Sequence, residues 1–171
     1  FLFASRDIWF VVALPVYLQS QLGWTYLAVG SLLAGWMIAY GAIQAFAPRI
    51  TGSRPDGNSA YIWAAILTLL PTAIGLALLF EWHIQTVLVL GLLVFGAVFA
   101  INSSVHSYLI VAWARQDGVS LDVGFYYMAN AAGRLLATIL SGLIYQQWGL
   151  AACLFGSAAF LLCSTLLARK L

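Results

Sequence analysis

Six long apolar runs, each of about 20 residues, dominate this sequence of 171 residues. The hydrocarbon core of a bilayer is about 30 Å thick, and about 20 residues of α-helix cross it. Lipid offers the backbone no hydrogen-bond partners, so runs of this kind are expected to be helices. We predict an all-α membrane protein in which residues 1–171 form one bundle of six transmembrane helices. The expected spans are approximately residues 1–19, 24–47, 60–80, 87–113, 123–146 and 150–168.

The composition excludes several functional classes. Hydrophobic residues make up 64% of the chain and charged residues only 7%, against about 25% charged residues in an ordinary globular domain. The charges are scattered singly, so we expect a lipid bilayer and no nucleic acid among the partners. No zinc-protease motif, serine elbow, His/Cys cluster or phosphate-binding glycine loop is present. We therefore expect no enzyme activity, no metal and no cofactor.

Basic residues follow every second span. Arg49 and Arg54 lie after the second span, Arg115 lies after the fourth, and Arg169 and Lys170 follow the sixth. The other three connections contain no lysine or arginine. Because cytoplasmic connections carry the excess of basic residues, both chain ends are expected on the cytoplasmic side of the inner (plasma) membrane.

Arg134 is the most informative single residue, because it lies near the middle of the fifth run. An arginine at mid-bilayer costs about 2.5–3.5 kcal/mol even on the lenient insertion scale, so it should face protein or water. Other polar residues recur at helical steps of three or four and share its face. The members of this face are Tyr127, Asn130, Arg134, Thr138, Ser141 and Tyr145.

Two interpretations of Arg134 are open. It pairs with an acid or with free carbonyls and so locks the bundle, or it binds an anionic solute in an aqueous cavity. We prefer the second, because a guanidinium grips carboxylate, phosphate or arsenate oxygens in pairs. The predicted substrate-binding face then includes Tyr127, Asn130, Arg134 and Ser141.

The first run holds Arg6 and Asp7 close to its start. The chain begins at Phe1 within an apolar stretch, and we expect it to be a fragment. If the two charges lie at the cytoplasmic interface, they anchor the span. If the missing residues continue the helix, Arg6 is a second cationic ligand and Asp7 a counter-ion or proton carrier. Pro15 is expected to loosen this helix.

The fourth run carries Asn102 and His106 on one helical face. Histidine titrates near neutral pH and so can relay protons or bind an anion; the alternative is a histidine whose hydrogen bonds are satisfied within the protein. In the second run, Trp36 and Tyr40 lie on one face and are interpreted as packing residues.

The third and sixth runs have hydroxyl groups as their main polar side chains, among them Thr68 and Thr165. Such hydroxyls can bond to carbonyls of their own helix, so these two helices can face lipid. Together with the long polar loop after the second span, this pattern resembles one half of a major facilitator superfamily transporter. The resemblance implies a C-terminal half built as a 3+3 inverted repeat, a missing N-terminal six-helix half, and a cavity between the two.

Three stretches are more specific: SRDIWFVVALPVYL, GWTYLAVGSLLAGWMIAYGAIQAFAPRI and VGFYYMANAAGRLLATILSG. They are similar to the organoarsenical efflux permeases (ArsJ) of bacterial arsenic-resistance operons. The resemblance implies export of 1-arseno-3-phosphoglycerate and resistance to arsenate, with Arg6, Asp7, Asn130 and Arg134 as motif members. The alternatives are a permease for another small solute and a self-contained six-helix scaffold that homodimerises.

Overall fold

The computed structural model describes residues 1–52, 54–115 and 118–169. These residues form helices and short connections, with no strand among them. In chain order, the elements are the 3₁₀ helix η1 (Ala4–Trp9) and the α-helices α1 (Ala13–Ser20), α2 (Tyr26–Phe46), α3 (Pro48–Thr51), α4 (Gly57–Leu79), α5 (Ile84–Ala112) and α6 (Val119–Ala168).

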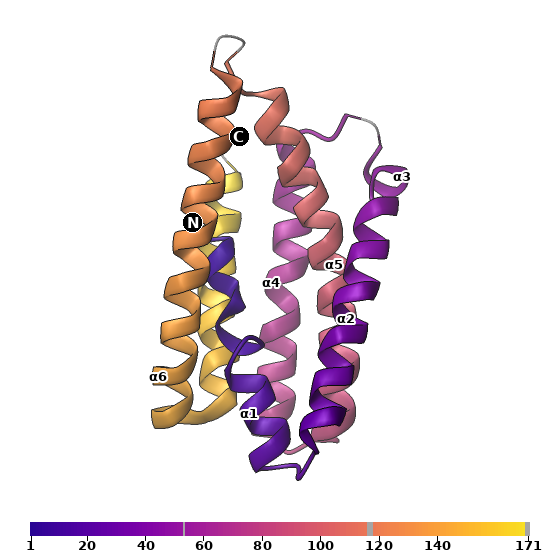
Figure 1. Ribbon diagram of the computed structural model, residues 1–171, viewed down its shortest axis with the longest axis vertical. Helices are drawn as coiled ribbons and strands as arrows, with labels where there is room; N and C mark the ends of the chain where they lie inside the picture. The colour runs from indigo at the N-terminus through magenta and orange to yellow at the C-terminus, as the bar shows by residue number, and fades with distance from the viewer. Residues whose placement is uncertain (53, 116–117, 170–171) are drawn as a thin grey trace.

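Four helical segments of the described chain are long and apolar enough to cross a membrane: Tyr26–Thr51, Gly57–Leu79, Ile84–Ala112 and Val119–Ala168. The last of these covers both the fifth and the sixth predicted span, because the helix reverses direction at Gly149 (Figure 1). Gly149 has φ 75° and ψ −172°, a conformation that other residues adopt only with strain. The segment therefore consists of two antiparallel arms, 119–148 and 150–168.

The first predicted span is not one continuous helix. The 3₁₀ helix η1 ends at Trp9 and α1 begins at Ala13, with a turn between them. Pro15, which was expected to loosen this run, lies in the first turn of α1. With this segment broken and the last two runs joined at Gly149, the count of six transmembrane helices is not confirmed and stays a prediction.

The long segments alternate in direction along the bundle (Figure 1). The end of α3, the start of α4, the end of α5, the start of α6 and the end of its second arm lie at one end, and the connections from α1 to α2 and from α4 to α5 and the reversal within α6 lie at the other. Arg49, Arg54, Arg115 and Arg169 thus belong to the same end of the molecule. Lys170 lies outside the described residues. This arrangement agrees with the predicted alternation of basic connections along the chain. That this end of the molecule faces the cytoplasm stays a prediction.

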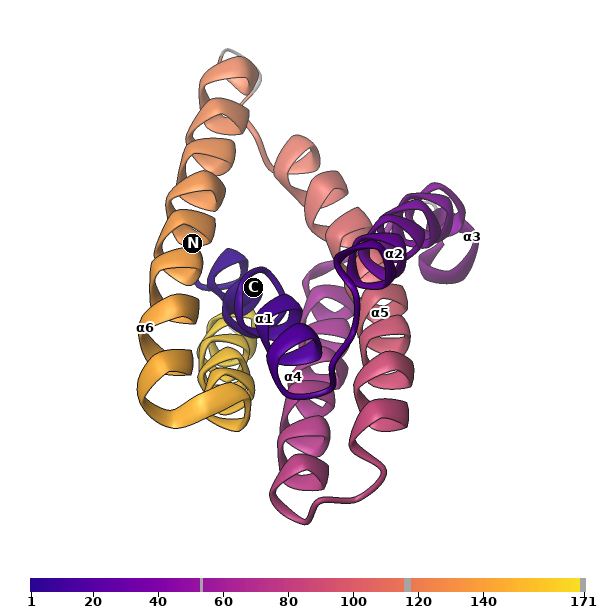
Figure 2. The same cartoon turned by 60° about the horizontal axis from the view of Figure 1, so that its bottom comes forward.

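The broken segment η1–α1 lies in the middle of the bundle, between α6 on one side and α4 and α5 on the other (Figure 2). Every residue of η1 is buried. The largest fully buried side chains of the core include Trp9, Leu14, Leu67, Phe95 and Leu154, which come from five different segments. Burial of their apolar area stabilises the bundle by about 25 cal/mol per Å².

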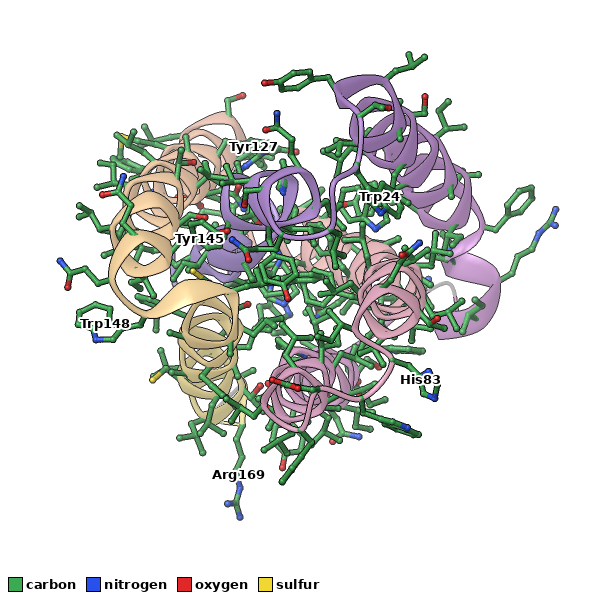
Figure 3. All side chains as sticks on the ribbon, turned by 90° about the horizontal axis from the view of Figure 1, so that it is seen from below. Trp24, His83, Tyr127, Tyr145, Trp148 and Arg169 are labelled. Carbon is green, nitrogen blue, oxygen red and sulfur yellow. The ribbon has the colours of Figure 1, made fainter. Side chains whose placement is uncertain are left out.

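Helix α4 packs against the second arm of α6. The hydroxyls of Thr68 and Thr165 lie 3.2 Å apart, and each also donates to a carbonyl of its own helix, at 2.8 Å. The predicted bonds within each helix are therefore confirmed. At the opposite end from the basic connections, Tyr145 lies beside α1, with its hydroxyl 3.4 Å from that of Ser20, while Trp148 points away from the bundle (Figure 3).

Candidate functional site

Three charged side chains meet inside the bundle. The carboxylate of Asp7 lies between two guanidinium groups: its Oδ2 is 3.2 Å from Nε of Arg134, and its Oδ1 is 3.6 Å from Nε of Arg6. Two arginines and one aspartate leave one positive charge in excess. The structure thus joins the first run to the fifth through Asp7, and Arg134 has the acidic partner that one interpretation of its sequence position required.

The backbone of η1 is held beside α6 by polar contacts and a close approach. The hydroxyl of Ser157 donates to the carbonyl oxygen of Arg6 at 2.6 Å, and that of Ser5 donates to the carbonyl oxygen of Gly133 at 3.4 Å. At Gly133 there is no room for a side chain, because a Cβ would meet the carbonyl oxygen of Phe1 and come within 2.9 Å of Cβ of Ala4. These contacts place Arg6 and Asp7 beside the middle of the first arm of α6.

Arg6 is buried, with 4% of its side chain exposed. Its guanidinium lies 4.1 Å from the ring centre of Phe3 and 3.6 Å from that of Phe99, and it donates a hydrogen bond to the carbonyl oxygen of Phe3. Cation–π contacts of a desolvated guanidinium are worth up to about 2 kcal/mol. These contacts hold Arg6 in place and compensate its charge.

Arg134 differs from Arg6 in its accessibility, since 63% of its side chain is exposed in this chain. Its Nε is used by Asp7, whereas no described residue bonds its terminal amino groups. A cavity of about 190 Å³ opens beside it. The lining residues are Arg6, Asp7, Phe10, Trp36, Met37, Tyr40, Phe99, Ser103, Asn130 and Arg134. This is a small chamber with aromatic walls and one accessible cation.

The other residues of the predicted face divide into two groups. Asn130 lines the cavity together with Arg134. Tyr127 is 59% exposed and Ser141 is buried, and neither lines the cavity. The Ser141 hydroxyl instead accepts a hydrogen bond from the backbone N–H of Ala13 at 3.0 Å. It satisfies a donor that the break between η1 and α1 leaves without a helical partner.

The two candidates for proton coupling are in different surroundings. Asp7 lines the cavity, and its Oδ1 has no hydrogen-bond partner among the described residues. The ring of His106 stacks on that of Phe3, with centres 4.5 Å apart, and Arg6 contacts the same ring at 4.1 Å. His106 Nε2 and both side-chain polar atoms of the fully buried Asn102 likewise lack partners within the described chain.

The aromatic walls are the part of the site that sequence reasoning missed. Trp36 and Tyr40 were interpreted as packing residues, and Trp36 does pack, with 5% of its surface exposed. Both also line the cavity, with Phe10 from the first run and Phe99 from α5. Their spacing of four on one helical face was the available signal. It identified a common face without showing which helix that face would meet.

The described residues contain no group of three or more His, Cys, Asp or Glu side chains that could hold a metal ion. The chemistry that the charged cluster supports is the binding of an anion by Arg134, in competition with the carboxylate of Asp7.

Comparison with known proteins gives one finding. The family model described as Major Facilitator Superfamily matches residues 1–171, the whole of the chain. Neither the curated proteins nor the solved structures give a match.

Proposed function

The chain belongs to the major facilitator superfamily, and on that premise we propose that it is the C-terminal half of an exporter for a small organic anion. Membership makes it an integral membrane protein of a family of small-solute transporters. Its exporting direction, its anionic solute, its position as one half of a longer chain and its cytoplasmic ends in the plasma membrane are our proposals.

A single observation carries the anionic solute: Arg134 is 63% exposed beside a cavity and shares a buried carboxylate with a second arginine. A mid-helix arginine facing lipid is costly, so its exposed side should meet water, solute or another helix. We propose that the missing half covers the exposed faces of α2 and of the first arm of α6. The cavity between the two halves would then place Arg134 in contact with the solute.

We propose 1-arseno-3-phosphoglycerate as the solute. Support comes from the three stretches similar to organoarsenical efflux permeases, because two of them contain the charged cluster, Arg6 and Asp7 in one and Arg134 with Asn130 in the other. The terminal amino groups of Arg134 are suited to paired phosphate or arsenate oxygens. Arg6, enclosed by Phe3 and Phe99, would contribute charge rather than direct contact. Tyr127 and Ser141 do not line this cavity, so any contact that they make with the solute would lie outside it.

Exchange of partners at Arg134 offers a way to couple binding to a proton. An arriving anion competes with Asp7 for Arg134, and the released carboxylate keeps Arg6 beside it, at 3.6 Å. Like-charge repulsion between the solute and Asp7 would favour a proton on Asp7. His106, stacked on Phe3 beside Arg6, is a second candidate for proton coupling.

The proposal is tested by export from cells that make the full-length protein and the dehydrogenase that forms the arsenical. A hydrogen bond to a charged group contributes about 1.5–3 kcal/mol, so Arg134→Gln should reduce efflux and arsenate tolerance about 10- to 100-fold. Arg134→Lys should fall between Arg134→Gln and the wild type, because lysine lacks the paired geometry.

Arg49→Gln is the matched control, since Arg49 is a basic residue at the end of the bundle that stacks on Phe46 at 4.9 Å. It should leave efflux unchanged at equal membrane abundance. Full efflux by Arg134→Gln would refute the assignment of Arg134 to the solute, whereas loss of folded Arg134→Gln protein would show that its pairing with Asp7 is structural.

A further inference from the structure

One wall of the cavity beside Arg134 is the indole ring of Trp36, which is held by a specific contact with α5. Its Nε1–H donates to the carbonyl oxygen of Leu92 at 2.9 Å. The ring centre lies 5.2 Å from that of Phe10 and 5.8 Å from that of Tyr40. Trp36 is therefore fixed in both position and orientation where it faces the cavity.

The position of this ring requires the absence of a side chain at residue 96. A Cβ built on Gly96 would clash with Nε1 of Trp36 and come within 2.9 Å of its Cε2. Real Cβ atoms do not approach other atoms so closely, so the indole occupies the space that a side chain of α5 would fill. By contrast, Gly35, next to Trp36 on α2, has no atom within 4 Å of its own built Cβ.

We infer that Trp36 determines how large an anion the cavity accepts, and that Gly96 is the positioning residue that holds Trp36 against α5. The cavity is only about 190 Å³, so the placement of one indole ring changes a large part of its width. The inference rests on the proposed function, because it concerns the body of the solute whose anionic end Arg134 binds.

The two residues predict opposite changes in selectivity. In Trp36→Leu the ring is removed and the chamber widens. In Gly96→Ala the new methyl group displaces the ring from α5 and narrows the chamber. Steric fit in a pocket discriminates between ligands by about 10- to 200-fold per methylene, so the expected changes are about tenfold or more.

The experiment measures binding of two anions with the same head and different bodies, methylphosphonate and phenylphosphonate, to the purified full-length protein by calorimetry. The ratio of phenylphosphonate affinity to methylphosphonate affinity should rise about tenfold in Trp36→Leu and fall about tenfold in Gly96→Ala. Gly35→Ala is the matched control and should keep the ratio within about twofold.

A second variant guards against misfolding. If Gly96→Ala does not fold, the double variant Trp36→Leu/Gly96→Ala should recover folded protein, because the clashing ring is gone, and should show the preference of Trp36→Leu. Binding that depends on Arg134 but has the same ratio in wild type and Trp36→Leu overturns the inference alone. Binding of both anions that is unaffected by Arg134→Gln, or no binding, overturns the proposed function with it.

Discussion

The broken segment η1–α1 and the first arm of α6 share the charged cluster, yet they treat their charges in opposite ways. Every residue of η1 is buried, and Arg6 is enclosed by two aromatic rings and a carbonyl oxygen. The first arm of α6 exposes most of one side, including 63% of the Arg134 side chain and 59% of Tyr127. One region supplies fixed charge, and the other presents charge at its surface.

The comparison distinguishes charged side chains that stabilise the fold from charged side chains that a ligand can reach. A buried charge is tolerated only where neighbouring groups compensate its desolvation, and removing one partner of such a set is strongly destabilising. An exposed pair contributes little to stability because water or another ligand can replace either partner. By this criterion, the stability of the bundle should depend on Arg6, whereas binding should depend on Arg134.

The largest expected effect is the loss of stability in Arg6→Gln. Breaking a buried ion pair costs about 3–5 kcal/mol, and the cation–π contacts to Phe3 and Phe99 are lost as well. Arg134→Gln is the matched control, and its free energy of unfolding should fall by less, because Arg134 is mostly exposed and Asp7 keeps Arg6 at 3.6 Å. Thermal unfolding of the purified full-length protein in detergent measures both. Equal melting temperatures for the two variants would remove the distinction between the two regions.

A second prediction concerns the surface along which the two regions touch. Gly133→Ala places a methyl group against the backbone carbonyl of Phe1 and against Ala4. Backbone cannot move aside as a flexible side chain does, so the overpacking should cost about 1–3 kcal/mol. Gly142, nine residues further along the same arm, has no atom within 4 Å of a built Cβ. Gly142→Ala should be neutral or stabilising by up to about 1 kcal/mol, because alanine favours a helix.

The measurement is the melting temperature, which should fall in Gly133→Ala and stay unchanged or rise in Gly142→Ala. If Gly142→Ala destabilises as much as Gly133→Ala, the contact of Gly133 with Phe1 and Ala4 has no special part in the stability of the bundle.

A third prediction tests the break between η1 and α1. Ser141→Ala removes the acceptor of the Ala13 N–H, and a buried donor left without a partner costs about 1–3 kcal/mol. The turn before Ala13 can adjust, so the lower half of that range is expected. Thr138 lies on the exposed side of the same arm, and its hydroxyl donates to the carbonyl oxygen of Arg134, within its own helix, at 2.9 Å. Thr138→Ala should therefore stay within about 0.5 kcal/mol. Similar losses in the two variants would show that Ser141 has no special part in the break.

The sequence predicted the regular helices well, because their length and apolar character follow from the bilayer. Residues 60–80 and 87–113 correspond to α4 (Gly57–Leu79) and α5 (Ile84–Ala112), each of which begins three residues earlier and ends one residue earlier than predicted. It did not predict the 3₁₀ helix, since hydrophobic periodicity does not distinguish it from the start of an α-helix. Gly149, between two apolar runs, was recognised only as a connection.

The charged cluster was partly predictable. The cost of a mid-membrane arginine singled out Arg134, and the resemblance placed Arg6 and Asp7 in a motif. Their meeting depends on how the first segment inserts between helices, which only the tertiary packing decides. The enclosure of Arg6 by Phe3 and Phe99 depends on α5, and no local pattern encodes a contact with so distant a segment. The hydrogen bond from the Ala13 N–H to Ser141 could not be predicted for the same reason.

The smallest expected change in stability is for a residue outside both regions, at the start of α4. Asp56 caps the start of α4, and its Oδ1 accepts hydrogen bonds from the backbone N–H and the hydroxyl of Ser59, both at 2.8 Å. These bonds hold the pKa of the Asp56 carboxyl below its ordinary value of 3.8.

A carboxylate whose pKa is lowered by folding stabilises the folded state above its unfolded pKa, and this contribution is lost as the pH falls through the folded pKa. At pH 7, Asp56→Ala should therefore lower the melting temperature slightly, and wild type and variant should converge as the pH is taken below 4. Asn58→Ala, an exposed change in the same turn, should show no such convergence. A difference in melting temperature between wild type and Asp56→Ala that stays constant from pH 7 to pH 3 would contradict this prediction. It would mean that the charge of the Asp56 carboxylate does not contribute to the stability of the cap.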